Sequence, residues 1–178
     1  MAQDARIRIF CALRLPAATI DALMAWQQEH LQLGRLVPRE NLHITLAFLG
    51  HRPEAELAGV VGALREAVAR AEPALLSARS YRETRSVGML ALDDEGDRAQ
   101  ALAVELHGRL EALGVYEPER RRWLPHVTVL RFRERPRLKP PLPDLEPFIP
   151  SDAAVYLSRL RPGGAQYEVL ESVALGGR

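Results

Sequence analysis

The sequence predicts an α+β fold in which antiparallel β-sheets carry helices on their outer sides. Three observations support this class. Strand-like and helix-like segments interleave over 178 residues. Several neighbouring strands are joined by turn sequences that are too short for a parallel crossover. A faint internal repeat places a His-x-Thr strand in each half of the chain, 83 residues apart. The length suits one domain, so we expect residues 1–178 to form a single folding unit.

The first half of the chain begins with a strand and continues with a helix and a second strand. Residues 7–13 are apolar and partly β-branched, and Pro16 ends this run, which predicts a strand. Apolar residues recur at helical spacing over 17–33 and predict a helix. Strict alternation over 42–49 predicts a half-buried strand. Its two faces hold Leu42, Ile44, Leu46 and Phe48, and His43, Thr45, Ala47 and Leu49, respectively.

Two further helices are marked by their end signals. Pro53 and the acidic residues after it suit a helix start, and the segment 57–68 carries an apolar stripe. Asp97 is a plausible N-cap for a third helix, and Gly114 follows it at the place where a left-handed residue is favoured. We therefore expect three helices in total.

The remaining strands are separated by turns and by one long loop. Residues 161–164 form a turn sequence, and the proline-rich segment 136–150 indicates a loop or an extended connection. Alternation and β-branched content identify the strands themselves. They are expected at 75–81, 87–92, 123–132, 153–160 and 167–175.

Composition excludes several classes of protein. Cys11 is the single cysteine and lies in an apolar run, so neither an internal disulfide nor a cysteine-rich metal site is available. Residues 1–8 carry charges of both signs and lead into a short apolar stretch, unlike a signal peptide or a membrane helix. We expect a cytoplasmic monomer with no membrane association and no obligate protein partner.

Basic residues are concentrated in one segment, although the net charge is only +1. Between Pro118 and Pro140 there are seven arginines and one lysine against two glutamates. Such local basicity favours an anionic partner such as a phosphate ester, but it is also typical of a solvated loop. Composition alone leaves both interpretations open.

Two His-x-Thr motifs are the strongest candidates for chemistry. Two of the four threonines, Thr45 and Thr128, stand two positions after His43 and His126. Chance would give this in well under about one chain in a hundred, whereas one such motif is more often packing. In a strand, residues i and i+2 share a face, so each motif presents an imidazole beside a hydroxyl. Two such pairs across a cleft supply an acid, a base and oxygen-binding hydroxyls, as phosphodiester cleavage requires.

The other histidines show no metal-binding pattern. His30, His51 and His107 lack paired ligand spacing, and no acidic residue is adjacent to the histidines at a spacing typical of zinc sites. We expect them to be structural or exposed, and we predict neither a metal nor a cofactor for this chain.

The residues carrying the motifs resemble a known family. Segments 43–50 and 125–131 are similar to the paired motifs of the two-histidine phosphoesterase superfamily, above all to its RNA 2',3'-cyclic phosphodiesterases, also called 2'-5' RNA ligases. Segments 8–16, 157–160 and 167–170 resemble the terminal strands of that group. The resemblance implies a bilobal fold with a pseudo-twofold axis and a central cleft lined by both motifs. It also implies hydrolysis of RNA 2',3'-cyclic phosphate ends, or of a cyclic nucleotide, to a 2'-phosphate.

The same resemblance assigns roles to individual residues. It implies that His43 is the proton donor and His126 the proton acceptor, which the residues alone leave unassigned. Thr45 and Thr128 are expected to bind the phosphate oxygens. Arg131 matches the family arginine after the second motif, and its guanidinium suits a pair of phosphate oxygens. Strict alternation places Arg131 opposite His126, so it needs a twist, a bulge or a strand end to reach the cleft.

Aromatic and basic residues near the motifs have two interpretations each. Phe48 holds the position in the first motif that Arg131 holds in the second, and it is a candidate substrate-binding residue that stacks on a base. Its alternation favours core packing instead. Trp123 and Phe10 are similar cases. Arg120–Arg122 are candidates for guiding RNA by salt-dependent attraction, and the basic loop is a candidate lid.

Three functions are therefore compatible with the sequence. Hydrolysis of a cyclic phosphate is favoured. The alternatives are 2'-5' RNA ligation by the reverse chemistry and a non-catalytic module that binds RNA or nucleotides.

Overall fold

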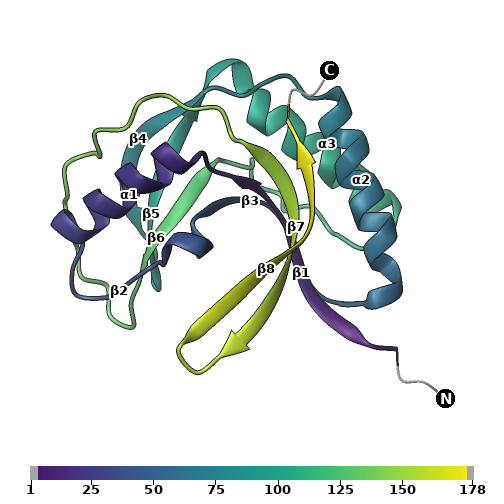
Figure 1. Cartoon of the computed structure of the whole chain (residues 1–178), viewed down its shortest axis with the longest axis horizontal. Coiled ribbons are helices and arrows are strands. Elements are labelled where there is room, and N and C mark those ends of the chain that lie inside the picture. The colour runs from purple at the N-terminus through teal and green to yellow at the C-terminus, as the bar shows by residue number, and fades with distance from the viewer. Residues whose placement is uncertain (1–3, 176–178) are drawn as a thin grey trace.

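The computed structural model describes residues 4–175, which fold into two antiparallel sheets and three α-helices (Figure 1). The strands are β1 (Arg6–Arg14), β2 (Arg35–Leu36), β3 (His43–Pro53), β4 (Leu76–Glu83), β5 (Val87–Asp94), β6 (His126–Arg131), β7 (Asp152–Arg161) and β8 (Gly164–Ala174). The α-helices are α1 (Ala17–His30), α2 (Leu57–Arg70) and α3 (Arg98–Ala112), with short 3-10 helices at Arg39–Asn41, Glu54–Glu56 and Glu95–Asp97. The predicted α+β class is confirmed.

The two sheets have four strands each and meet along two of them. Their orders are β3-β1-β7-β8 and β2-β6-β5-β4. β3 is an edge strand of the first sheet, and β6 is bordered on one side only by the two-residue β2. β3 and β6 contact each other. The fold therefore brings together the two strands that begin with His43 and His126.

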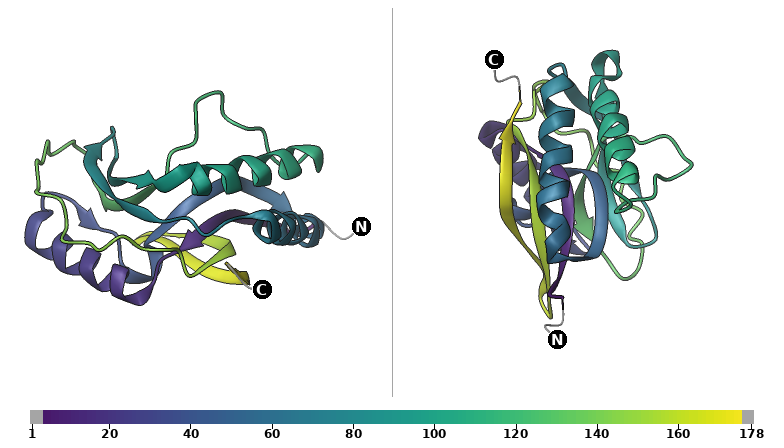
Figure 2. Two further views of the ribbon diagram at one scale, coloured as in Figure 1. Left: turned by 90° about the horizontal axis from the view of Figure 1, so that it is seen from above. Right: turned by 90° about the vertical axis from the view of Figure 1, so that its right-hand side faces the viewer.

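The helices cover the sheets on the sides away from this meeting line. α2 packs against β7 and β8, and α3 packs against β3 and β5. Figure 2 shows α2 and α3 lying side by side. α1 lies on the second sheet, where Trp26 packs edge-on against Tyr81 of β4. One cluster of buried apolar side chains includes residues of both sheets and of all three helices. No helix among residues 4–175 has the length and apolar character to cross a bilayer.

The predicted elements are present, with differences at their ends. α1 ends at His30, before residue 33, because Leu31 is already extended and Leu33 has a left-handed φ of 63°. β3 continues to Pro53, because its last residues pair with the start of β1. β2 was not predicted, since two residues are too few to show alternation. The hairpin between β7 and β8 turns through Pro162 and Gly163, as the turn sequence predicts.

The predicted cap of α3 is wrong. Asp97 adopts a left-handed conformation with φ of 54°, and its side chain makes no capping hydrogen bond. Instead, the Asp94 carboxylate accepts hydrogen bonds from the N–H groups of Ala99 and Gln100, at 3.0 and 2.9 Å. Gly96, with φ of 68°, allows the chain to turn back toward this carboxylate. The cap thus comes from the end of β5, which also suits the positive end of the helix dipole.

Candidate active site

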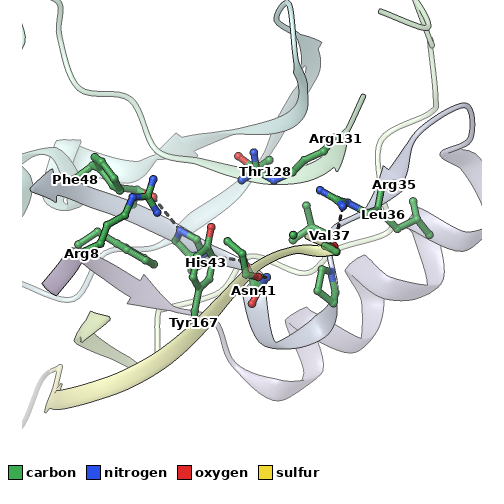
Figure 3. Close-up of a pocket in the computed structure, with 16 residues that line it drawn as sticks. Arg8, Arg35, Leu36, Val37, Asn41, His43, Phe48, Thr128, Arg131 and Tyr167 are labelled. Atoms are coloured by element: carbon green, nitrogen blue, oxygen red, sulfur yellow. Dashed lines mark hydrogen bonds between the residues drawn. The ribbon is translucent and has the colours of Figure 1, made fainter. Parts of the chain in front are cut away.

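A cavity of about 450 Å³ lies where the two sheets meet (Figure 3). Its volume falls within the range of small-ligand sites in proteins. Its wall includes His43, Thr45, Phe48, Thr128, Arg131 and Tyr167. Residues of both motifs, together with Phe48 and Arg131, therefore contribute to one site, although they come from opposite halves of the chain.

His43 is held by hydrogen bonds at both ring nitrogens. Nδ1 lies 2.8 Å from the backbone oxygen of Asn41, and Nε2 lies 2.9 Å from Oγ1 of Thr45. A carbonyl oxygen only accepts, so Nδ1 carries the proton, and in the neutral ring Nε2 accepts from the Thr45 hydroxyl. The rings of Phe10 and Tyr167 lie 5.0 and 5.5 Å from the imidazole, between centroids. In the neutral ring, Nε2 is thus the nitrogen without a proton.

Burial favours the neutral form of His43. Removal from water lowers its pKa from 6.5 to about 4. The hydrogen bond to Asn41 opposes this shift, whereas electrostatic interaction with His126 and Arg131 adds to it. An anion bound beside the imidazole favours the charged form, so a phosphate would raise the pKa again. The protonation of His43 is therefore linked to the occupancy of the cavity.

His126 repeats the local geometry of His43 in a more exposed position. Its Nδ1 lies 3.1 Å from the backbone oxygen of Leu124, which is again two residues earlier in the chain. The same argument gives a proton on Nδ1 and leaves Nε2 available. His126 is not part of the cavity wall itself, but electrostatic interaction with it contributes to the lowered pKa of His43.

A β-bulge follows each motif and determines which side chains enter the cavity. The pairing of β3 with β1 skips Leu46, and the pairing of β6 with β5 skips Val129. In both strands the skipped residue and its successor are buried. The next residue is Phe48 in β3 and Arg131 in β6, and both line the cavity. One extra residue reverses the alternation of a strand, so two equivalent bulges give equivalent results.

The bulges correct one prediction and explain another. The preference for core packing of Phe48 is wrong, because its side chain is 48% exposed and the Arg8 guanidinium lies 4.6 Å from its ring centroid. Arg131 reaches the cavity through the bulge that its position in the strand requires. The functions of Phe48 and Arg131 in substrate binding stay predictions.

Two helix side chains hold the bulges in place. Nε2 of His107 in α3 lies 2.7 Å from the backbone oxygen of Leu46. In the other lobe, Nε2 of Gln27 in α1 donates to the backbone oxygen of Val129 at 2.8 Å and to that of Val37 at 3.1 Å. A bulge interrupts the ladder, and His107 gives the Leu46 carbonyl a partner, while Gln27 adds a second donor to the Val129 carbonyl, which also accepts from the Val37 N–H. The predicted structural role of His107 agrees with this contact.

The remaining aromatic and histidine candidates have mainly structural contacts. Phe10 is 3% exposed and stacks on Tyr156, so it forms part of the cavity floor. The Trp123 indole donates to the backbone oxygen of Thr45, at 3.1 Å, and thereby supports β3. His30 lies at the end of α1, and His51 lies on the exposed part of β3, after the left-handed Gly50, and not in a loop.

Several cavity residues were missed by sequence reasoning. Arg35 donates to the backbone oxygen of Gly163 at 2.8 Å, and Asn41 donates to that of Ala165 at 2.9 Å. Both bonds tie the tip of the β7–β8 hairpin to the segment before β3, and all four residues line the cavity. Arg8 lines it as well. No spacing signal links these residues, because each comes from a different element.

The arginines predicted to guide RNA lie elsewhere. Arg120–Arg122 are exposed and do not line the cavity. Arg121 and Arg122 form ion pairs with Glu119 and Asp97, at 2.6 and 2.7 Å. Their charges are thus partly neutralised within the loop that precedes β6.

Comparison with known proteins identifies the family. The family model described as 2'-5' RNA ligase superfamily matches residues 15–158. The chain belongs to this superfamily. An RNA 2',3'-cyclic phosphodiesterase of Thermus thermophilus is 34% identical to it over 185 residues, with 96% of this chain and 91% of that protein covered. A protein of the same name from Escherichia coli is 28% identical, with 94% and 96% covered.

Solved structures of the superfamily share the fold. The crystal structure of the protein TT0787 of Thermus thermophilus matches with a TM-score of 0.79 at 30% identity, and covers 96% of this chain and 99% of that chain. The resemblance inferred from the two motifs is thereby confirmed at the level of the 2'-5' RNA ligase superfamily.

Proposed function

We propose that this member of the superfamily hydrolyses RNA 2',3'-cyclic phosphate ends to 2'-phosphomonoesters, with His43 and His126 as its acid and base. The observation that carries the proposal is one cavity lined by His43, Thr45 and Thr128, with His126 two residues before Thr128 on β6 and each histidine Nδ1 bonded to a backbone oxygen. Relatives of 34% and 28% identity that are named for this activity support the substrate class. The chain is a cyclic phosphodiesterase on these grounds.

The proposed reaction is an in-line displacement at phosphorus. His126 accepts a proton from the attacking water, whose oxygen forms the new bond to phosphorus. The bond from phosphorus to the ribose 3' oxygen breaks, and His43 donates a proton to that oxygen through Nε2. The hydroxyls of Thr45 and Thr128 and the guanidinium of Arg131 bind the non-bridging oxygens as charge redistributes. This scheme requires no metal ion and no cofactor.

The electrostatics of the cavity set a condition on this assignment. His43 is neutral when the cavity is empty, because burial lowers its pKa to about 4. The bound phosphodiester carries one negative charge and favours the protonated ring. The acid form of His43 is therefore produced in the complex with substrate, where it is needed.

Hydrolysis is tested with a short RNA that ends in a 2',3'-cyclic phosphate, in the presence of a chelator. The expected product is a terminal 2'-phosphate. Neither His43→Ala nor His126→Ala should form it. His51→Ala is the matched control, since His51 lies exposed on the same strand as His43 and outside the cavity. Near wild-type turnover in both cavity variants would contradict the proposal.

Two alternative functions would give different results with the same RNA. The superfamily description also names 2'-5' RNA ligation, which reverses the same chemistry. An acceptor RNA with a 5'-hydroxyl would give a joined product if ligation occurs. A non-catalytic binding module would bind the RNA end and leave every cyclic phosphate intact.

The cellular setting stays a proposal as well. We propose a cytoplasmic monomer that acts as a single two-lobed domain. Cys11, the single cysteine, is fully buried in β1 and free, in keeping with a reducing compartment. Sedimentation of the purified chain would test the monomeric state.

A further inference from the structure

Cations without acidic partners gather at one end of the second sheet. Within residues 4–175, arginines on the other surfaces are mostly paired with carboxylates, as Arg14, Arg52 and Arg98 are. A contrasting group has no carboxylate within ion-pair distance among the described residues, and all of its members are exposed. This group, the basic strip, consists of Arg82, Arg85, Arg131, Arg133, Arg137 and Lys139.

The basic strip is formed by two neighbouring parts of the chain. Arg82 and Arg85 lie at the end of β4 and in the turn to β5, and the others lie at the end of β6 and in the segment after it. The backbone N–H of Phe132 donates to Ser86 at 3.0 Å and joins the two parts. Between residues 131 and 143, Glu134 is the single acidic residue. The local field is therefore strongly positive.

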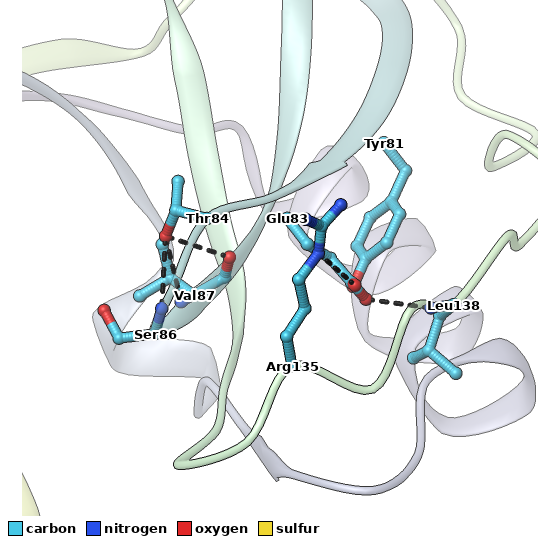
Figure 4. Close-up of polar contacts among 7 residues, drawn as sticks. All are labelled: Tyr81, Glu83, Thr84, Ser86, Val87, Arg135 and Leu138. Atoms are coloured by element: carbon cyan, nitrogen blue, oxygen red, sulfur yellow. Dashed lines mark hydrogen bonds and ion pairs between the residues drawn. The ribbon is translucent and has the colours of Figure 1, made fainter.

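A buried carboxylate fixes the segment that carries the strip (Figure 4). The Glu83 side chain is 2% exposed, and it accepts hydrogen bonds from the Tyr81 hydroxyl at 2.8 Å and from the N–H of Leu138 at 3.0 Å. Burial acts to raise the pKa of Glu83, but these hydrogen bonds and Arg135 lower it below its usual value. Glu83 is thus ionised. Its carboxylate forms an ion pair with Arg135, at 3.4 Å, and not with a member of the basic strip.

The basic strip is continuous with the active-site cavity. Arg131 belongs to both, and it pairs across the sheet with Arg35 of β2. Figure 3 shows Arg131 and Arg35 at one end of the cavity and Phe48 with Arg8 at the other. From Arg131 to Lys139 the chain has no helix and spans at most about 28 Å. Cations therefore continue from the cavity along the segment that follows β6.

We propose that the basic strip binds the phosphates of the RNA strand that precedes the terminal cyclic phosphate, so the preferred substrate is an oligonucleotide end and not a cyclic mononucleotide. This rests on the proposed function, which places the cyclic phosphate in the cavity beside Arg131. The strand must then leave the cavity, and the Arg131 end offers guanidinium groups that bind phosphate oxygens in pairs. Such contacts ignore base identity and weaken with salt.

The test compares two substrates and two triple variants. The strip variant is Arg133→Gln with Arg137→Gln and Lys139→Gln, which leaves Arg131 intact. The control variant replaces Arg120, Arg121 and Arg122 with Gln, so it removes the same charge from a loop outside the cavity. The substrates are adenosine 2',3'-cyclic phosphate and a twelve-nucleotide RNA with the same terminus. The rate constant kcat/KM is measured at 50 and 200 mM salt.

The expected result separates the strip from the catalytic residues. Three phosphate contacts predict a fall of about 20-fold in RNA affinity between the two salt concentrations, from a slope of about −0.7 per contact. Because Arg82, Arg85 and Arg131 remain in the strip variant, we expect its salt dependence of kcat/KM for the oligonucleotide to be about 20-fold smaller than in the wild-type and control proteins, and its kcat/KM at low salt to be at least about tenfold lower. Turnover of the mononucleotide should be equal in all three proteins, which also shows that they are folded.

Three outcomes would overturn the inference. Equal oligonucleotide turnover by the strip variant and the wild type, with the wild type active, would overturn the basic strip as an RNA path alone. A loss of oligonucleotide turnover in the control variant instead would place the RNA path at Arg120–Arg122. It would also overturn the basic strip as the RNA path. A wild-type protein that leaves both substrates intact would overturn the proposed function, and the inference with it.

Discussion

Substitution of Gln27 by methionine removes the side-chain donor that holds the second bulge while keeping the length of the side chain. Gln27 is 1% exposed, and its Nε2 donates to the backbone oxygens of Val37 and Val129, at 3.1 and 2.8 Å. Val129 also accepts from the N–H of Val37 at 3.1 Å, so it keeps one partner in the variant. Val37 loses its side-chain donor. One buried carbonyl without its donor costs about 1–3 kcal/mol, so we expect Gln27→Met to lower the free energy of unfolding by about 2 kcal/mol.

Equilibrium denaturation in urea measures this change, with Gln28→Met as the matched control. Gln28 is the next residue in α1 and is exposed, so its substitution should stay within about 0.5 kcal/mol of the wild type. Because Val129 is the bulged residue, Gln27→Met should also raise the KM for the cyclic phosphate by loosening the position of Arg131. A midpoint equal to that of the control would refute the reasoning, since the two hydrogen bonds would then contribute nothing to stability.

Further predictions concern the cap of α3, the protonation of His43 and the guanidinium in the cavity. Asp94→Ala should cost about 1 kcal/mol in urea denaturation, and exposed Asp93→Ala almost nothing; equal effects would contradict the assigned cap. The pKa of His43 is about 4 in the folded chain and 6.5 as its ordinary value, so its neutral form stabilises the fold fully above pH 6.5 and progressively less as the pH falls toward 4. Between pH 7 and pH 4.5 the free energy of unfolding of the wild type should therefore fall by about 2.5 kcal/mol more than that of His43→Gln, as measured by urea denaturation at each pH. Parallel pH profiles of the two proteins would contradict the lowered pKa. Arg131→Lys should raise KM more than it lowers kcat, because an ammonium cannot bind two phosphate oxygens at once, and unchanged kinetics would remove Arg131 from the site.

The strands that carry the site could be predicted because their signal is local. Apolar residues at every second position identify β3 and β6, and two matched His-x-Thr motifs identify the chemistry within them. The same rule failed at Phe48. Alternation assumes one residue per step, and the bulge at Leu46 depends on the pairing with β1 and on His107, which is 61 residues away. A single strand contains no sign of either.

The rest of the cavity is assembled by contacts that no segment shows alone. Arg35 and Asn41 enter the site because they bind the tip of the β7–β8 hairpin, more than 120 residues later in the chain. The cap of α3 is a similar case. Asp97 has the residue type of a cap, but the left-handed conformation at that position turns it away, and Asp94 takes its place. Residue type predicted the kind of cap and not its position.

Each bulge separates the His-x-Thr motif of its strand from the cavity-lining side chain that follows it. Within each motif the histidine and threonine stand before the extra residue, whereas Phe48 and Arg131 stand after it. If β3 paired with β1 without this bulge, plain alternation would turn the aromatic ring of Phe48 toward the interior, while His43 and Thr45 kept their places. The same step in two lobes presents an aromatic ring on one side and a cation on the other. A change at Phe48 or Arg131, the third residue after each threonine, would therefore alter the cavity wall and leave the histidine and threonine of each motif in place.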